Sequence, residues 1–472
     1  MTNDAQTADQ SPDLIAASQA QGPNLTQDSI PSLLAKLAIP AAIGFLFATL
    51  YNLVDTYWAN QWSTDAADGF GVAGGPFFLM VAVAIGLNQG GTTMISNALG
   101  SGDKVAARAS FFQSFILGAG ASVILAVAGW LMTEPALNSL YGDRPALVDE
   151  AKSYLVPIYL FTFTFIFSFA MNSALAAQGD FATLGIVQIA AFCLNMFFDP
   201  ALMHGWGPLP QLGVAGLAAS TVTINFIGMA VILWRTMNSE LMRGFQLSEF
   251  GINVPIMSDL IRQSLPAALN MVVISGGYIV IPYFLAEFGE GAAAGYSTGT
   301  RIEQLILLPV IGLQIAVLAI IGQNMGAGQF ARVRQTFWSG IWISLAIMGG
   351  GTVLIWLTFD LFSNFFAGDA AVRRMSNLYL IYSSFALLSY GIMQISVGAL
   401  QGMKRPLMPL FVNIVRLIIG PSLGMIVAIY VFDPANIHVA WSVYLLFAWL
   451  CALFIFFYAL RQMKAVKALS SH

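Results

Sequence analysis

The chain has 472 residues, of which 58% are hydrophobic and only 9% are charged, and its formal net charge at pH 7 is −4. Soluble domains carry about 25% charged residues, so this composition excludes an ordinary soluble protein. Apolar runs long enough to cross ~30 Å of hydrocarbon as a helix recur along the sequence. They are too long for the ~10-residue strands of a membrane barrel, which leaves an all-α polytopic membrane protein.

The first 31 residues differ from the rest of the chain. They are polar and acidic, they contain no Lys or Arg, and they lack the basic region and apolar core of a signal peptide. A segment that buries so little apolar surface does not fold on its own, so we predict a disordered cytoplasmic tail over residues 1–31.

Twelve apolar segments follow in chain order, and each predicts a transmembrane helix. The first six lie at 32–59, 70–98, 105–132, 148–177, 181–204 and 211–236. The second six lie at 259–287, 292–325, 332–360, 372–402, 406–431 and 437–462. Between the two sets, residues 237–258 form a predicted cytoplasmic connector, and residues 463–472 form a C-terminal tail on the same side.

The charges of the loops predict the orientation. With the N-terminus inside, most of the 19 Lys and Arg residues fall in inner loops, and only Arg144, Lys152, Arg373 and Arg374 fall in outer ones. Because basic loops stay on the cytoplasmic side, both termini are predicted to be cytoplasmic, in a multi-pass protein of the cell (inner) membrane.

The two sets of helices repeat each other. A shift of 226 residues places Pro40 on Pro266 and places the glycines of the loop at 100–102 on those at 326–328. A shift of 223 places Gln178-Gly179 on Gln401-Gly402. Because the repeat has an even number of helices, both copies share one orientation. We therefore predict an N-lobe (32–236) and a C-lobe (259–462) related by a pseudo-two-fold axis along the membrane normal, an arrangement that suits alternating access.

Five stretches of the chain resemble the multidrug and toxic compound extrusion (MATE) family of transporters: LAIPAAIGFLFATLYNLVDTYWAN, NALGSGDKVAAR, LGVAGLAAS, RIEQLILLPVIGLQIAVLAIIGQNMGAG and GALQGMKRP. The resemblance runs from about residue 30 to 460. Aspartates in the first and fifth helices resemble the DinF-like branch. The resemblance implies export of cationic or amphipathic compounds, driven by inward movement of H+ or Na+.

Three acids lie at bilayer depth, away from the ends of the predicted spans: Asp55, Asp199 and Glu303. A charge at bilayer depth costs at least ~2.5–3.5 kcal/mol, so each is a functional-site hypothesis. Asp55 and Asp199 both lie near the outer ends of helices that run in the same direction, which places them at similar depth. Two adjacent carboxylates in a low dielectric cannot both stay charged, so one holds a proton or a cation binds between them. The alternative is that each merely bonds a neighbouring helix.

Polar neighbours surround the two acids in the sequence. Tyr51 and Asn52 precede Asp55 by one helical turn, and Asn195 precedes Asp199 by one turn, so they can share a face with the acids. If the ion is Na+, its predicted protein ligands are Asp55, Asp199 and Asn195. Spacing alone does not choose between H+ and Na+.

The MATE resemblance assigns ion coupling to the acids at positions 55 and 199 and adds three polar residues to the network: Asn195, Tyr154 and Asn172. Thr221 reaches the same layer from the sixth helix. Tyr51, Asn52 and Pro40 are candidates for substrate contact or gating, because Pro40 removes a backbone hydrogen bond and permits the first helix to bend. A static kink is the alternative.

The C-lobe carries buried charges of its own. Glu303 and Arg301 lie in the eighth predicted helix, and Arg416 lies in the eleventh. We expect a structural ion pair of Glu303 with Arg416 or Arg301, with a charge that faces the substrate as the alternative.

Several functions lack their motifs. The sequence has no phosphate-binding loop and no H-E-x-x-H motif, and its three histidines are not paired at metal-ligand spacing. We therefore predict no cofactor beyond the coupling ion and no binding of nucleic acid. The expected protein is a monomeric secondary antiporter for small cationic or amphipathic molecules in contact with membrane lipid. A flippase for lipid-linked oligosaccharides is the alternative, and an intramembrane aspartyl protease is a remote one.

Overall fold

The computed structural model describes residues 23–246, 249–366, 369–432 and 436–469. Eleven of its helices are long and apolar enough to cross a membrane. Two shorter helices, α5 (Pro145–Leu160) and α6 (Phe163–Ala177), are bent by 46° relative to each other and together form a twelfth span. Each of the twelve predicted segments therefore corresponds to one span, and the fourth is bent.

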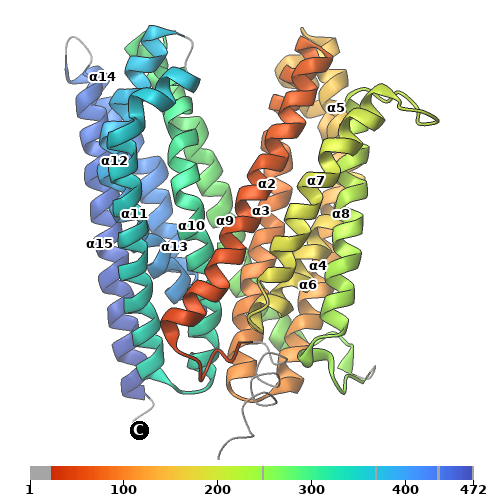
Figure 1. Ribbon diagram of the computed structural model, residues 1–472, viewed down its shortest axis with the longest axis vertical. Helices are drawn as coiled ribbons and strands as arrows, with labels where there is room; N and C mark the ends of the chain where they lie inside the picture. The colour runs from red at the N-terminus through yellow and green to blue at the C-terminus, as the bar shows by residue number, and fades with distance from the viewer. Residues whose placement is uncertain (1–22, 247–248, 367–368, 433–435, 470–472) are drawn as a thin grey trace, which may run out of the picture.

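Figure 1 shows the helices in two bundles. The N-lobe holds α5, α6 and five long helices: α2 (Ile30–Trp62), α3 (Thr64–Gly100), α4 (Lys104–Tyr141), α7 (Ala182–His204) and α8 (Val214–Met237). The C-lobe holds α9 (Val254–Leu285), α10 (Ala292–Gly326), α11 (Phe330–Phe366), α12 (Ala370–Gly402) and α15 (Ile437–Leu469). Its eleventh span is made of α13 (Leu407–Ile414), a π-helical segment η4 (Val415–Ile419) and α14 (Gly420–Tyr430).

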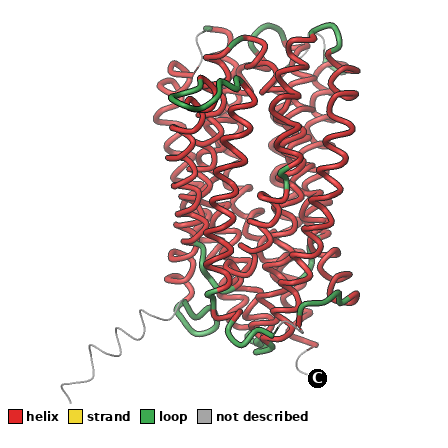
Figure 2. The backbone as a smooth tube through the Cα atoms, turned by 90° about the vertical axis from the view of Figure 1, so that its right-hand side faces the viewer, coloured by secondary structure: helices red, strands yellow, loops and turns green. Residues whose placement is uncertain are grey.

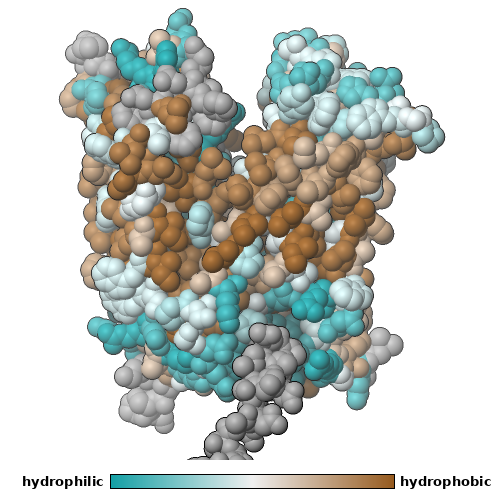
Figure 3. Space-filling view, viewed as in Figure 1, coloured by the Kyte–Doolittle hydropathy of each residue, from teal (hydrophilic) through white to brown (hydrophobic). Residues whose placement is uncertain are grey.

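The helices run along the long axis of the molecule, and the loops gather at its two ends (Figure 2). We call the end at which α2 begins and α15 finishes the terminal end, and the opposite one the distal end. A broad apolar band lies between hydrophilic ends, as a membrane-spanning protein requires (Figure 3). The same view shows a cleft between the lobes that opens at the distal end.

The loop sequences contain the signals that start the helices. Ser63 accepts the backbone N–H of Ala66 at the start of α3, and Asp103 accepts that of Ala106 at the start of α4. Such side chains satisfy backbone donors that the first helical turn leaves free. Gly102 and its repeat partner Gly328 both have positive φ, which glycine adopts without steric cost after the ends of α3 and α10.

At the terminal end the two lobes meet through small residues, and the contacts obey the repeat. Gly100 of α3 lies against the carbonyl of Gln323 on α10, and Gly326 lies against the carbonyl of Asn97. A Cβ atom on either glycine would overlap the opposing carbonyl. Nearer the middle of the molecule, Gly312 packs on Ala42 of α2, and the equivalent Gly86 packs on Ala268.

Two amide side chains add hydrogen bonds between the lobes. Asn97 donates to the carbonyl oxygen of Gly402 at 3.1 Å, and its repeat equivalent Gln323 donates to that of Ala177 at 2.7 Å. Each lobe thus donates to the main chain of the other. These bonds and the glycine contacts hold the terminal end closed while the distal end is open.

The chain before α2 differs from the expected disordered tail. Residues 1–22 lie outside the described residues, but the segment from Pro23 to the start of α2 is packed between the lobes. Leu25 is 1% exposed and contacts Gly179 of the N-lobe. Its carbonyl accepts hydrogen bonds from Asn324 and Arg332 of the C-lobe at 2.9 and 3.3 Å. A buried apolar side chain, together with a buried amide and a partly buried guanidinium that need acceptors, explains why this polar segment is ordered.

The connector between the lobes is fastened to the N-lobe. The Arg108 guanidinium binds the Glu249 carboxylate through two hydrogen bonds of 2.6 and 3.0 Å. Gln113 donates to the carbonyl of Gly251 at 2.6 Å and accepts the backbone N–H of Asn253 at 3.1 Å. The part of the connector that leads into α9 is therefore anchored to α4 of the N-lobe.

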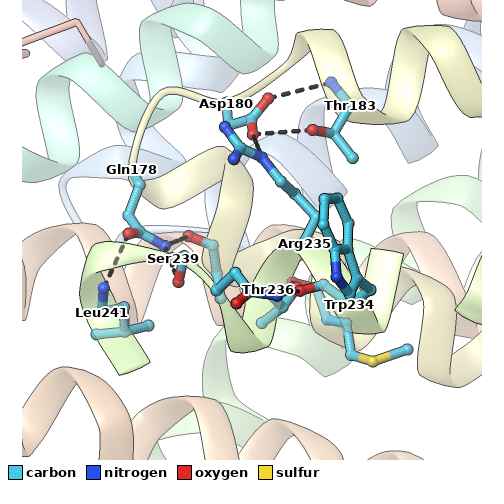
Figure 4. Close-up of polar contacts among 11 residues, drawn as sticks. Gln178, Asp180, Thr183, Trp234, Arg235, Thr236, Ser239 and Leu241 are labelled. Atoms are coloured by element: carbon cyan, nitrogen blue, oxygen red, sulfur yellow. Dashed lines mark hydrogen bonds and ion pairs between the residues drawn. The ribbon is translucent and has the colours of Figure 1, made fainter. Parts of the chain in front are cut away.

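Figure 4 shows the start of this connector, where it leaves α8. Gln178 donates to the hydroxyl of Ser239 at 3.2 Å and accepts the backbone N–H of Leu241 at 3.0 Å. Asp180 pairs with Arg235 at the end of α8 and also accepts from Thr183 in the first turn of α7. The Gln-Gly loop of the first repeat thus holds the start of the connector.

Replacing Gly100 by Ala is expected to force the terminal end apart, because the new methyl group meets the backbone of α10 rather than a movable side chain. Spin labels at Asn60 and Glu287, in a variant without its two native cysteines, would report a shorter distance across the distal cleft. Gly75→Ala is the matched control, since a Cβ at this position of the same helix meets nothing within 4 Å. Unchanged label distances in Gly100→Ala would contradict the tight contact.

Loss of the Glu249 charge is expected to free the connector. Hydrogen bonds from Arg108 hold the pKa of the Glu249 carboxyl below its usual range. The contribution of this pair is therefore complete above the ordinary pKa of about 4.3 and is lost as the pH falls through the lower folded-state value. At neutral pH, Glu249→Gln should increase the rate of chymotrypsin cleavage at Phe250 several-fold. Glu240→Gln, which removes only an exposed 3.7 Å pair with Arg243, should not.

Candidate functional site

Asp55 and Asp199 meet inside the N-lobe. Asp55 is 2% exposed on α2 and Asp199 is fully buried on α7, in the distal halves of two helices that pack against each other. The two carboxyl groups are close enough for their charges to interact. Asn195, one turn before Asp199, donates to Oδ1 of Asp55 at 2.8 Å. The structure thus brings together the three residues that the sequence proposes as ion ligands.

Several oxygens at this place lack hydrogen-bond donors. Both carboxyl oxygens of Asp199, the side-chain oxygen of Asn195 and the hydroxyl of Ser220 are buried and form no hydrogen bond of normal geometry with a described residue, although Asp55, Asn195 and Ser220 lie beside Asp199. Leaving a buried polar group unsatisfied costs about 1–3 kcal/mol, and more when the group is charged. A cluster of bare oxygens around two carboxyls can bind a proton or a small hard cation such as Na+.

Tyrosines and a threonine close one side of the acid cluster. The Tyr51 hydroxyl donates to Oγ1 of Thr221 on α8 at 3.1 Å. Tyr154 of α5 is 3% exposed and lies beside both acids and Thr221. Phe70 packs edge-on against the Tyr154 ring at 4.9 Å and fixes its position. Tyr51, Tyr154 and Thr221 therefore lie where the sequence predicted them.

Three other predicted residues lie outside this network. The Asn52 side chain is exposed, and Asn172 on α6 forms no hydrogen bond with either acid. Pro40 lies in the terminal half of α2, which continues through it as one helix. At this point α2 approaches α7 so closely that a Cβ atom on Gly185 would lie 2.8 Å from the Pro40 carbonyl oxygen.

The ion pair that we expected in the C-lobe is not formed by the described residues. Glu303 accepts a hydrogen bond from the Tyr379 hydroxyl at 2.5 Å, and Arg301 is exposed. The Arg416 guanidinium carbon lies 3.9 Å from the centre of the Tyr390 ring. Each charge instead lies against a tyrosine of α12, Glu303 against Tyr379 and Arg416 against Tyr390. The sequence does not predict how α10 packs relative to η4.

Sequence reasoning missed the second-lobe tyrosines and Ser220. A detectable signal existed for one of them. Shifting the chain by 225 residues, rather than 226 or 223, aligns Tyr154-Leu155 with Tyr379-Leu380. The aromatic contact of Phe70 with Tyr154 then corresponds to that of Tyr296 with Tyr379, whose ring centres are 5.0 Å apart. Each lobe thus has a tyrosine beside a buried acid.

Two pseudo-symmetric helical lobes around a cleft that opens at one end, with buried acids inside one lobe, define a multi-pass membrane transporter rather than an enzyme. The MatE family model matches residues 40–201 and 266–426, and the two matches begin one repeat apart. The chain therefore belongs to the MatE family of transporters for small molecules.

Curated relatives cover most of the chain at low identity. A probable multidrug resistance protein NorM of Thermotoga maritima is 26% identical over 83% of this chain and 85% of its own length. An FAD transporter of Shewanella oneidensis is also 26% identical, over 83% of this chain and 86% of its own length. The probable multidrug resistance protein YoeA of Bacillus subtilis is 25% identical over 84% and 87%.

Solved structures share the fold. A transporter of the MOP superfamily from Pyrococcus furiosus, described as having a binding pocket of reverse polarity, superposes with a TM-score of 0.87. An outward-facing multidrug resistance MATE transporter gives the same score. Each is 20% identical to this chain, and each match covers 94% of this chain and 98% of the other.

Replacing Asp199 by Asn is expected to stabilise the protein, because it removes a buried carboxyl whose two oxygens have no donors. We expect a gain of about 1–3 kcal/mol at neutral pH, seen as a higher melting temperature in detergent. Asp143→Asn, at an exposed position of the same end, is the control and should leave the melting temperature unchanged. A clear fall for Asp199→Asn would mean that the carboxylate is already stabilised in the site.

Proposed function

We propose that the protein is a secondary antiporter that exports cationic or amphipathic small molecules in exchange for H+ or Na+. The observation that carries this proposal is the pair of adjacent buried carboxyls, with oxygens that lack donors, in the distal half of the N-lobe. In this proposal the protein is a monomer in the inner membrane, its terminal end is cytoplasmic, and the cleft opens to the outside.

The geometry supports a simple cycle. With the distal end open, an ion from outside reaches Asp55 and Asp199 and neutralises them. Neutral acids no longer hold a cationic substrate, which leaves through the cleft. They also no longer repel each other, so α2 and α7 are free to pack differently and the terminal contacts open. Ion release into the cytoplasm restores the charges and with them the affinity for the next substrate.

Relatives that are named after their function support the export of small molecules. Several that match over about four-fifths of the chain are named multidrug resistance proteins, and one is named an FAD transporter. The flippase alternative needs a cleft lined by basic groups for pyrophosphate. Among the arginines predicted within spans, Arg301 is exposed and Arg416 stands alone in the C-lobe interior, which favours the antiporter.

Asp55→Asn is expected to abolish coupled export. An amide resembles the protonated acid but neither binds nor releases the ion, so the cycle stops. Export of a fluorescent cation from vesicles with an imposed ion gradient should fall at least about tenfold, to the level of empty vesicles. The protein should keep its melting temperature, and Asp143→Asn should transport normally. Undiminished export by Asp55→Asn would contradict the coupling role.

The coupling ion is identified by removing Na+ at a fixed pH gradient. Export that persists shows that H+ suffices, and export that stops identifies Na+. Export that requires ATP and no ion gradient would contradict secondary transport altogether.

A further inference from the structure

Arg416 is a partly buried cation of the C-lobe that forms no ion pair with another described residue, although the buried acid Glu303 is close enough for its charge to act on it. Its Nε atom is buried and has no hydrogen-bond partner, and its Nη1 contacts the Met393 sulfur at 3.9 Å. No ion pair among the described residues includes it. The guanidinium lies over the ring of Tyr390, which is 1% exposed.

The ring of Tyr390 does not replace an anion. A cation over an aromatic ring gains up to about 2 kcal/mol, whereas removing a charge from water costs several kcal/mol. A guanidinium also has five N–H donors in one plane, a geometry that matches the two oxygens of a carboxylate or phosphate. Arg416 therefore has both the charge and the free donors to bind an oxyanion.

The polar groups around Arg416 form hydrogen bonds with one another. Glu303 is bound by Tyr379, and the hydroxyls of Tyr390 and Tyr444 are bonded to each other. Trp441 packs on Tyr379 and Tyr444, and its buried indole N–H has no acceptor. The cluster thus has two kinds of unused donor, on Arg416 and on Trp441, within an aromatic wall.

The local backbone and the repeat both single out this position. Arg416 lies in η4, a π-helical segment, and such segments are rare and concentrate at functional sites. The equivalent helix of the N-lobe, α7, is uninterrupted and carries Asp199. The fifth helix of one lobe therefore offers a buried acid, and the fifth helix of the other offers a cation.

We propose that Arg416 recognises an oxyanion group, a carboxylate, sulfonate or phosphate, on the transported molecule. The inference rests on the proposed export function and adds a class of substrate to it: amphipathic molecules that carry an acidic group, zwitterions included.

Two dyes that differ in one group test the proposal: a rhodamine with a free carboxylate and its methyl ester. In vesicles, Arg416→Gln should raise the KM for the acid about tenfold or more and change that for the ester by less than about twofold. Arg416→Lys should be intermediate for the acid, because it keeps the charge and loses the planar pair of donors. Arg301→Gln removes an exposed arginine of the same lobe and should affect neither dye.

Binding to the purified protein gives a second readout that does not depend on transport. The acid should raise the melting temperature of the wild type in detergent more than that of Arg416→Lys, and the ester should raise both equally. If Arg416→Gln fails to fold, Arg416→Lys carries the comparison. Equal effects of the substitutions on acid and ester would overturn the proposal and leave the export function standing.

The remaining outcomes are also decisive. A wild type that exports only the ester overturns the oxyanion site alone, and one that exports neither dye rejects the export function and the site with it. Vesicles of neutral lipid and vesicles with added anionic lipid distinguish the source of the oxyanion. If the effect of Arg416→Gln on KM depends on the anionic lipid and not on the carboxylate of the dye, a lipid phosphate binds Arg416 and the proposal is wrong.

Discussion

The open shape of the molecule depends on a backbone contact at its terminal end. Gly100 and Gly326 allow α3 and α10 to approach until each glycine touches a carbonyl of the other helix, and Asn97 and Gln323 add reciprocal hydrogen bonds. The lobes are joined at this end and lie apart at the distal end, where the cleft opens. A buried apolar cluster backs this contact, in which Leu33, Leu34 and Leu37 of α2 pack together with residues of α10 and α11.

The scaffold is nearly symmetric, but the chemistry is not. Gln178 caps the end of α6 and its equivalent Gln401 lies in the last turn of α12, yet Gln178 holds the connector whereas Gln401 donates to Gln89 between the lobes at 2.8 Å. In the same way, Tyr154 lies beside two acids, and its equivalent Tyr379 binds one acid from another helix. The two lobes therefore share one fold but have differently charged interiors.

The sequence predicts the fold well, since apolar length, loop charge and the repeat are properties of the chain itself. It also predicts that Asp55 and Asp199 meet, because the number of residues between each acid and its helix end gives the depth of that acid in the membrane. It fails where side-chain direction decides. Tyr51 and Asn52 lie about 40° and 60° to opposite sides of Asp55 around α2, and only Tyr51 turns inward. The predicted ion pair of Glu303 is wrong for a related reason. Which charges meet depends on how three helices pack together, and no local sequence pattern contains this information.

One contact lies on the axis between the lobes. Gly322 packs against Ser96, and the two positions are equivalent in the repeat, so the pseudo-two-fold axis passes between them. In a dimer of two identical six-helix chains, the residue at this position would face its own copy, and two bulky residues could not both fit there. Because both lobes belong to one chain, the two positions can differ, and a serine and a glycine share the axis.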